Sequence, residues 1–157
     1  MTSVHDGTRG RMIDGGAIRE LVARYVEAVA LFDADLYRSV WEPDAVWEVH
    51  GRGRFVGPSA ITDLFVELRG RQEMAVQRVV GGRARCNATE GRGRWIIHSL
   101  TRTEGKGEEL LGVYEDRYRK SEDAWRFLER SFHPLYRGPA ALPGRVFAPP
   151  VLVPLDL

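Results

Sequence analysis

The chain has 157 residues, 43% of them hydrophobic, and its 23 basic side chains nearly balance 22 acidic ones, for a formal net charge of +1. This length suffices for one domain with a sizeable core, and the interspersed charges argue against binding to nucleic acid or to an anionic membrane. One cysteine excludes a disulfide framework and a thiolate metal site, and no apolar run approaches the ~18 residues of a membrane span.

Residues 1–13 show no hydrophobic periodicity and are expected to form a disordered leader. They lack the apolar stretch of a secretory signal, so a cytoplasmic location is expected. The predicted domain begins at residue 14 with a helix. Its apolar positions recur at helical spacing on one face, namely Ile18, Leu21, Tyr25, Val29 and Phe32. The Tyr25 hydroxyl is therefore predicted to enter an apolar wall, where a buried phenol needs a hydrogen-bond partner.

A short second helix and a strand hairpin are predicted next. Asp33 is placed to cap this helix, and the Glu-Pro-Asp step at 42–44 is expected to end it. Residues 46–49 then alternate as a strand, and the Gly-Arg-Gly step at 51–53 is typical of a hairpin loop. A third helix is expected over residues 58–68, with a proline in its first turn.

The second half of the chain is predicted to form four strands, over residues 75–87, 92–103, 109–120 and 125–132. Alternation puts Trp95, Ile97 and Ser99 on one face and Ile96 and His98 on the other. Both faces carry apolar side chains, which is unusual for an antiparallel sheet with one wet face. The outer face is therefore expected to meet another subunit, in a homodimer or homotrimer.

Residues 138–157 contain five prolines, and only Arg145 and Asp156 are charged. The prolines exclude a long helix, and the segment is too apolar for a solvated disordered tail. We expect an extended arm that lies on an apolar surface, either the mouth of a pocket or a neighbouring subunit.

Several short motifs occur in a recognisable order: Ile18-x-x-Leu21-x-x-x-Tyr25, Asp44-Ala45-Val46-Trp47, Gly57-Pro58-Ser59-Ala60-Ile61, GRGRWIIHSL at 91–100 and GVYEDRYRKSEDAWRF at 112–127. In this order, over residues 14–137, the chain resembles the SnoaL-like branch of the nuclear transport factor 2-like superfamily. The resemblance implies an α+β fold, a cone-shaped barrel in which three N-terminal helices lie on a strongly curved, mostly antiparallel sheet.

The resemblance also shows what is missing. Relatives with lyase activity, such as hexachlorocyclohexane dehydrochlorinase and bile-acid 7α-dehydratase, have a catalytic aspartate that the resemblance aligns with position 30 of this chain. Their partner histidine aligns with the start of the third strand. This chain has Ala30, and residues 74–78 include no histidine. Tyr25 matches a tyrosine of the bile-acid enzyme, and Arg130 falls where some dehydrochlorinase variants have arginine.

Four residues are candidates for catalysis. Tyr25 is a hydrogen-bond donor or acid, with a core tyrosine as the alternative, and Arg130 is its electrostatic partner or else part of a structural ion pair. Asp33 or His98 is the base, although Asp33 also suits a helix cap and His98 faces the pocket only if its strand shifts by one residue. The side chains expected to contact a ligand are Phe32, Trp47, Val49, Phe55, Trp95, Ile97, Tyr114 and Phe132. Glu115, Asp116 and Arg117 are expected to form an ion-paired surface.

These patterns favour a cofactor-free lyase, isomerase or cyclase, which moves protons on a hydrophobic cyclic small molecule inside an enclosed pocket. The histidines and the lone cysteine show no metal-ligand spacing, and the glycine pairs precede no helix that could bind a nucleotide, so no metal or cofactor is expected. The alternative is a non-catalytic binding module that keeps the fold and lacks the aspartate–histidine pair.

Overall fold

A computed structural model describes residues 6–155, with side chains from residue 14 onward. It contains three helices, α1 (Asp6–Leu31), α2 (Ala34–Ser39) and α3 (Pro58–Gly70). The strands are β1 (Trp41–Val49), β2 (Gly53–Val56), β3 (Met74–Cys86), β4 (Glu90–Thr103), β5 (Lys106–Ser121) and β6 (Ala124–Ala140). They form one sheet in the order β2-β1-β6-β5-β4-β3, in which β1 and β6 are parallel and all other neighbours antiparallel.

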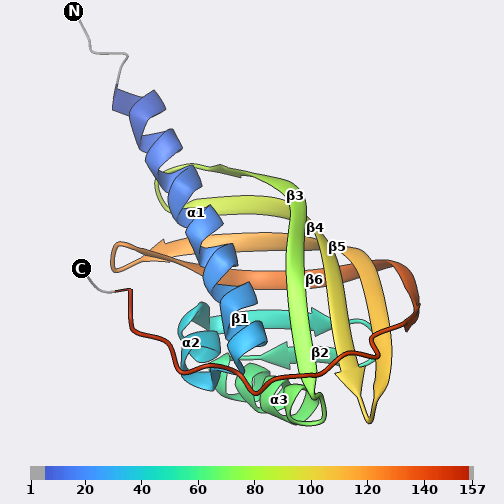
Figure 1. Ribbon diagram of the computed structural model, residues 1–157. Helices are drawn as coiled ribbons and strands as arrows, with labels where there is room; N and C mark the ends of the chain where they lie inside the picture. The colour runs from blue at the N-terminus through green and yellow to red at the C-terminus, as the bar shows by residue number, and fades with distance from the viewer. Residues whose placement is uncertain (1–5, 156–157) are drawn as a thin grey trace, which may run out of the picture.

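The helices cover one face of this curved sheet (Figure 1). Helix α1 crosses the long strands, whereas α2 and α3 pack together beside β1 and β2. The sheet does not close, because β2 and β3 remain at its two edges. The predicted fold, three helices on a curved and mostly antiparallel sheet, is confirmed.

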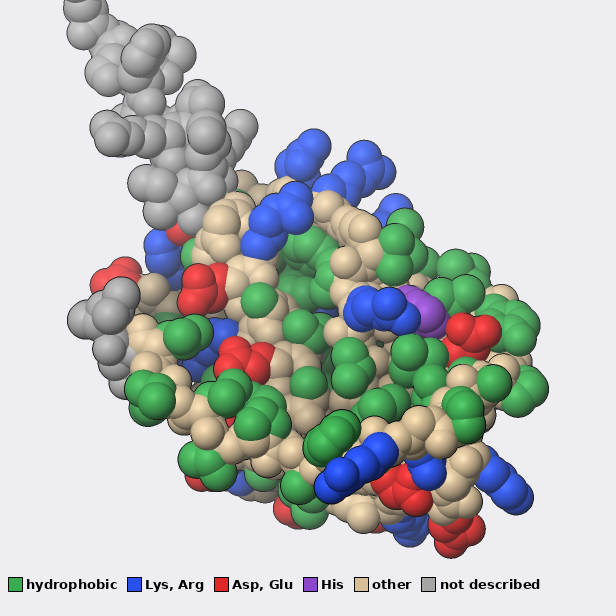
Figure 2. Space-filling model, in the orientation of Figure 1, with side chains coloured by type: hydrophobic (Ala, Val, Ile, Leu, Met, Phe, Trp, Pro, Cys, Tyr) green, Lys and Arg blue, Asp and Glu red, His purple; other side chains and the backbone are tan. Residues whose placement is uncertain are grey.

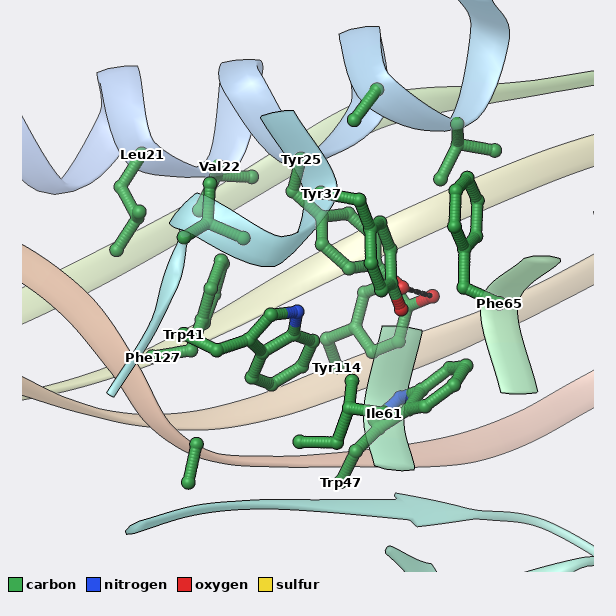
Figure 3. Close-up of a cluster of buried hydrophobic side chains, with 14 of the residues drawn as sticks. Leu21, Val22, Tyr25, Tyr37, Trp41, Trp47, Ile61, Phe65, Tyr114 and Phe127 are labelled. Atoms are coloured by element: carbon green, nitrogen blue, oxygen red, sulfur yellow. Dashed lines mark hydrogen bonds between the residues drawn. The ribbon is translucent and has the colours of Figure 1, made fainter. Parts of the chain in front are cut away.

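Alternation along β4 sorts the side chains as the sequence predicts. Trp95, Ile97 and Ser99 are buried beneath the helices, whereas Ile96 is 48% exposed on the outer face. The inner face and α1 enclose an aromatic core, in which Tyr25 contacts the rings of Tyr37, Trp41, Tyr114 and Phe127 (Figure 3). Apolar burial between these two layers is the main source of stability for such a fold.

The chain between α2 and β1 differs from the prediction. Helix α2 ends at Ser39, and β1 already begins at Trp41, so the step at 42–44 lies within the strand. Trp41 pairs with Phe127, and the pairing with β6 resumes only at Val46. Pro43 falls in this irregular stretch, where a missing N–H does not interrupt the regular ladder.

Strand β6 is longer than predicted. Its pairing with β5 continues from Ala124 to Ala140 and includes two prolines, with register shifts that accommodate the irregular backbone. Helix α1 begins at Asp6, inside the stretch expected to be a leader, and residues 1–5 lie outside the described residues. None of the described helices is long and apolar enough to cross a membrane.

After Ala140 the chain continues without regular secondary structure to residue 155. Arg102 holds the beginning of this segment, since its Nη1 donates to the carbonyl oxygens of Leu142 at 3.3 Å and Gly144 at 2.6 Å. In Figure 1 the segment runs along the lower part of the molecule, past α3. Its apolar side chains from Val151 to Leu155 are exposed.

Candidate functional site

A cavity of about 410 Å³ lies between α1, α3 and the inner face of the sheet. Its apolar wall is built by Val29, Trp47, Phe65, Ile97 and Phe132. Three helices and five strands contribute to the lining, so the site exists only in the folded chain. A cavity of this size and lining suits a small, largely apolar ligand.

Three tyrosines from different elements meet in this wall, and we call Tyr25, Tyr37 and Tyr114 the tyrosine cluster. The Tyr25 and Tyr114 hydroxyl oxygens are 3.4 Å apart, and Gln77 Nε2 donates to the Tyr114 oxygen at 3.2 Å. The Tyr37 ring centroid lies 5.2 Å from that of Tyr25, and its hydroxyl is buried near the other two without a hydrogen-bond partner among the described residues (Figure 3). An unpartnered buried hydroxyl at a cavity wall is a group that a polar ligand atom would satisfy.

Burial sets the protonation state of the tyrosine cluster. Desolvation disfavours the phenolate and raises the pKa of Tyr25, Tyr37 and Tyr114 far above the ordinary value near 10.0. The neighbouring Arg130 charge lowers each pKa, but by less than burial raises it. The three phenols therefore stay neutral and can donate hydrogen bonds, but they cannot serve as bases near neutral pH.

Arg130 lies behind the tyrosine cluster and does not line the cavity. Its guanidinium carbon is 4.2 Å from the ring centroid of Tyr25 and 3.9 Å from that of Tyr114. Its Nε and Nη2 donate to the two carboxylate oxygens of Asp116, both at 2.8 Å, and neither side chain is exposed. Burial alone lowers the pKa of Arg130, but the Asp116 carboxylate more than offsets this and raises it, so the guanidinium stays charged.

A buried chain of hydrogen bonds extends from this ion pair to the far end of the core. Tyr118 donates to Asp116 Oδ2 at 2.7 Å, and Trp95 Nε1 donates to the Tyr118 hydroxyl at 2.6 Å. The expected ion-paired surface at 115–117 is thus wrong for Asp116, which faces inward. Glu115 and Arg117 do face outward, where they pair with Arg94 and Glu129.

The lining also includes one imidazole and one carboxylate, those of His50 and Glu108. His50 follows β1 at the β1–β2 turn, and Glu108 lies near the start of β5. Glu108 Oε1 is 3.4 Å from Arg137 Nε, so its charge is partly compensated. Both are less buried than the tyrosine cluster, which places the proton acceptors toward the cavity mouth.

Arg69 closes the wall between α1 and α3. Its Nε donates to the Val29 carbonyl at 2.9 Å, Nη2 to the Ala30 carbonyl at 3.4 Å and Nη1 to the Gln72 carbonyl at 2.9 Å. The Val29 and Ala30 carbonyls belong to the last turn of α1, where a helix leaves acceptors unsatisfied, and the Gln72 carbonyl lies just after α3. Arg69 therefore holds the two helices together beside Ala30.

Six of the residues predicted to bind a ligand or to act in catalysis line this cavity: Tyr25, Trp47, Val49, Ile97, Tyr114 and Phe132. Trp95 is fully buried beside Tyr118 at the other end of the core. Phe32 packs outside the cavity against Phe65, and Phe55 pairs with Trp47 on the neighbouring strand.

Neither predicted base lies at the cavity. Asp33 is exposed and caps α2, since the Leu36 N–H donates to its Oδ1 at 2.9 Å. His98 is on the outer face of the sheet, 3.1 Å from Glu109 Oε2, because β4 keeps the unshifted register. The structure thus separates both from Tyr25.

Sequence reasoning missed Tyr37, Gln77 and His50. The parity of β3 would have found Gln77, because Ala75 is buried and residues two apart share a face. Helix α2 has only six residues, too few for periodicity to orient Tyr37. His50 follows the strand at a turn, where alternation no longer predicts direction. Among the described residues, no group of three histidine, cysteine, aspartate or glutamate side chains is placed to hold a metal ion.

The sequence model of the SnoaL-like domain matches residues 11–131, which is most of the chain. The chain belongs to this family. A search of curated proteins found no match. The cone of helices and sheet is shared with solved structures of small-molecule enzymes.

Hexachlorocyclohexane dehydrochlorinase LinA type 2 superposes with a TM-score of 0.80 at 22% identity, over 92% of this chain and 99% of that one. LinA-type3 from Novosphingobium barchaimii LL02 gives 0.79 at 23% identity, over 91% and 99%. A candidate scytalone dehydratase from Novosphingobium aromaticivorans gives 0.79 at 14% identity, over 90% and 96%. At these identities the likeness establishes the fold.

Proposed function

We propose that this protein is a lyase, isomerase or cyclase that moves protons on a hydrophobic cyclic small molecule without a cofactor. The observation that carries the proposal is the tyrosine cluster, in which neutral phenols meet at the wall of an apolar cavity. Dehydration, isomerisation and ring closure of such molecules commonly build negative charge on a carbonyl oxygen. Donors fixed in a water-poor cavity stabilise that charge.

Tyr25, Tyr37 and Tyr114 would bind the substrate oxygen. The Tyr37 hydroxyl has no partner to give up, and the long 3.4 Å contact between Tyr25 and Tyr114 is weak enough to be exchanged for a ligand. The buried Arg130 charge behind two of these rings makes their hydroxyls better donors as charge develops. Arg130 thus acts through the tyrosines and is a positioning residue.

His50 is the proposed base, with Glu108 as the alternative. The buried phenols hold their protons, and Asp33 and His98 lie away from the cavity, so the acceptor comes from the remaining lining groups. An imidazole nitrogen can accept a proton from a substrate, whereas the Glu108 carboxylate is already paired with the Arg137 guanidinium at 3.4 Å. This assignment replaces the aspartate–histidine pair that the chain lacks.

The cavity can be tested before its substrate is known. Purified protein is incubated in D₂O with a panel of cyclic ketones and enones, and loss of the proton beside the carbonyl is followed by NMR. The wild type is expected to catalyse exchange for at least one compound. Each of Tyr37→Phe and Tyr114→Phe should slow it by about 10²–10³, the usual effect of removing one oxyanion donor.

Control variants separate chemistry from folding. Tyr136→Phe removes an exposed hydroxyl and should leave the exchange rate unchanged. His50→Gln should abolish exchange without loss of ligand binding, while Glu108→Gln should retain it. Binding without exchange in the wild type would favour the non-catalytic module, and failure of every compound to bind would refute both readings.

We also propose that the protein is a homodimer or homotrimer. The outer face of the sheet exposes Val76, Ile96 and Leu135, and the C-terminal segment exposes Val151 and Leu155. Apolar side chains exposed on the sheet face and on the C-terminal segment are typical of a subunit contact.

A further inference from the structure

A second cleft, of about 480 Å³, lies on the outer face of the sheet, away from the tyrosine cluster. We call the five arginines around it the arginine grid: Arg83, Arg85, Arg92, Arg94 and Arg117. Figure 2 shows basic side chains gathered at the top of the molecule, where β3 and β4 lie in Figure 1. These arginines are interspersed with acidic residues along the sequence, and they gather only when three strands pair.

The strand register brings like charges directly opposite each other. Arg83 pairs with Arg94 and Arg85 pairs with Arg92 across β3 and β4, and Arg92 in turn pairs with Arg117 across β4 and β5. Residues in such positions have Cβ atoms about 4.5–5.5 Å apart, so the repulsion between them opposes folding. A sheet face that serves only solubility would alternate the two signs.

Carboxylates offset only part of this charge. Glu115 lies 3.1 Å from Arg94, and Glu129 lies 3.0 Å from Arg117. Asp116 is also among the residues that line the cleft, but its buried carboxylate is already paired with Arg130. Within residues 14–155, Arg83, Arg85 and Arg92 form no ion pair.

We propose that the arginine grid is a binding site for a small, multiply charged oxyanion of the phosphate, diphosphate or polycarboxylate type. Guanidinium groups donate paired, planar hydrogen bonds that match such oxygens, and a ligand with several charges relieves the repulsion between neighbouring arginines. The cleft holds a compact ligand, and the carboxylates on β5 and β6 limit the basic area on that side. A long polyanion would find no continuous basic track.

The test uses the full-length protein and inorganic diphosphate, with phosphate and citrate as further probes. Binding is measured by calorimetry at a constant ionic strength of about 0.15 M, with chloride as the reference anion, since screening then acts equally on all probes. The wild type should bind diphosphate and should melt at a higher temperature with it than with chloride.

Variants locate the site. Arg85→Gln and Arg92→Gln should each weaken diphosphate binding about tenfold, the value of one charge-assisted contact. Arg85→Lys and Arg92→Lys keep the charge but lose the paired donors, and should fall between glutamine and wild type. Arg71→Gln, which removes an exposed arginine at the end of α3, is the matched control and should bind as the wild type does.

Three results would overturn the proposal. If chloride raises the melting temperature as much as diphosphate does, the arginine grid is only a solvated surface. Tight binding of a single-stranded oligonucleotide with weak binding of diphosphate would make it a nucleic-acid surface. An oligomer whose mass depends on salt, and falls in Arg85→Gln and Arg92→Gln, would mean that acidic groups of a second copy cover the arginine grid. None of these outcomes bears on proton exchange in the inner cavity, so the two proposals fail independently.

Discussion

The buried pair of Arg130 and Asp116 gives the sharpest prediction for stability. Both side chains are fully buried, and two contacts of 2.8 Å join the guanidinium to the carboxylate. Asp116→Ala removes both acceptors, while Arg130 Nη1 already has no partner among the described residues. The aromatic rings around the guanidinium are present before and after the change and cannot replace the lost anion.

The expected loss is large because an uncompensated charge would remain in the core. Breaking a buried ion pair from one side costs about 3–5 kcal/mol, whereas the whole free energy of unfolding of a domain is about 5–15 kcal/mol. Arg130→Met should cost less than Asp116→Ala, since Tyr118 still donates to the remaining carboxylate. The double variant removes both charges and should be more stable than the sum of the single losses predicts, by about 2 kcal/mol or more.

Urea unfolding of the four proteins completes this thermodynamic cycle. With an m value of about 2 kcal/mol/M, a loss of about 4 kcal/mol moves the midpoint by about 2 M. Circular dichroism of each variant before unfolding checks that the fold is retained. A loss below about 1 kcal/mol for Asp116→Ala, or single losses that simply add, would show that Arg130 and Asp116 do not depend on each other for stability.

Three further predictions concern the core, the tyrosines and the C-terminal segment. Trp95→Ala should lower the free energy of unfolding by about 3–5 kcal/mol, because a buried indole and its bond to Tyr118 are lost, and a neutral result in urea unfolding would contradict the packing. The raised pKa values of Tyr25, Tyr37, Tyr114 and Tyr118 mean that the unfolded chain releases these protons first. The stability they contribute is therefore fully present below pH 10 and is lost above it, by about 1.4 kcal/mol per pH unit for each. Ultraviolet titration should show these four tyrosines ionising only as the protein unfolds. Gradual ionisation of the four in the folded state would contradict this prediction. Deleting residues 142–157 should lower the number of subunits per particle in light scattering, and an unchanged number of subunits with an unchanged melting temperature would show that this segment does not hold the subunits together.

The sequence could orient side chains within an element but not across elements. Strand alternation predicted the buried Trp95, Ile97 and Ser99, and the Asp33 cap also appears in the structure, because both depend on a few neighbouring residues. Asp116 shows the limit of such reasoning. Its charged neighbours suggested a surface, but its true partner is Arg130, fourteen residues away on the next strand.

Motifs and periodicity were enough to predict the family, the order of helices and strands, and the faces of β4. The residues that line the two clefts come together only in the folded chain. Tyr25 and Tyr114 meet across 89 residues of chain, and the arginine grid depends on the register of three strands. Such groupings are set by long-range packing and pairing, where a shift of one residue would turn each strand side chain to the other face.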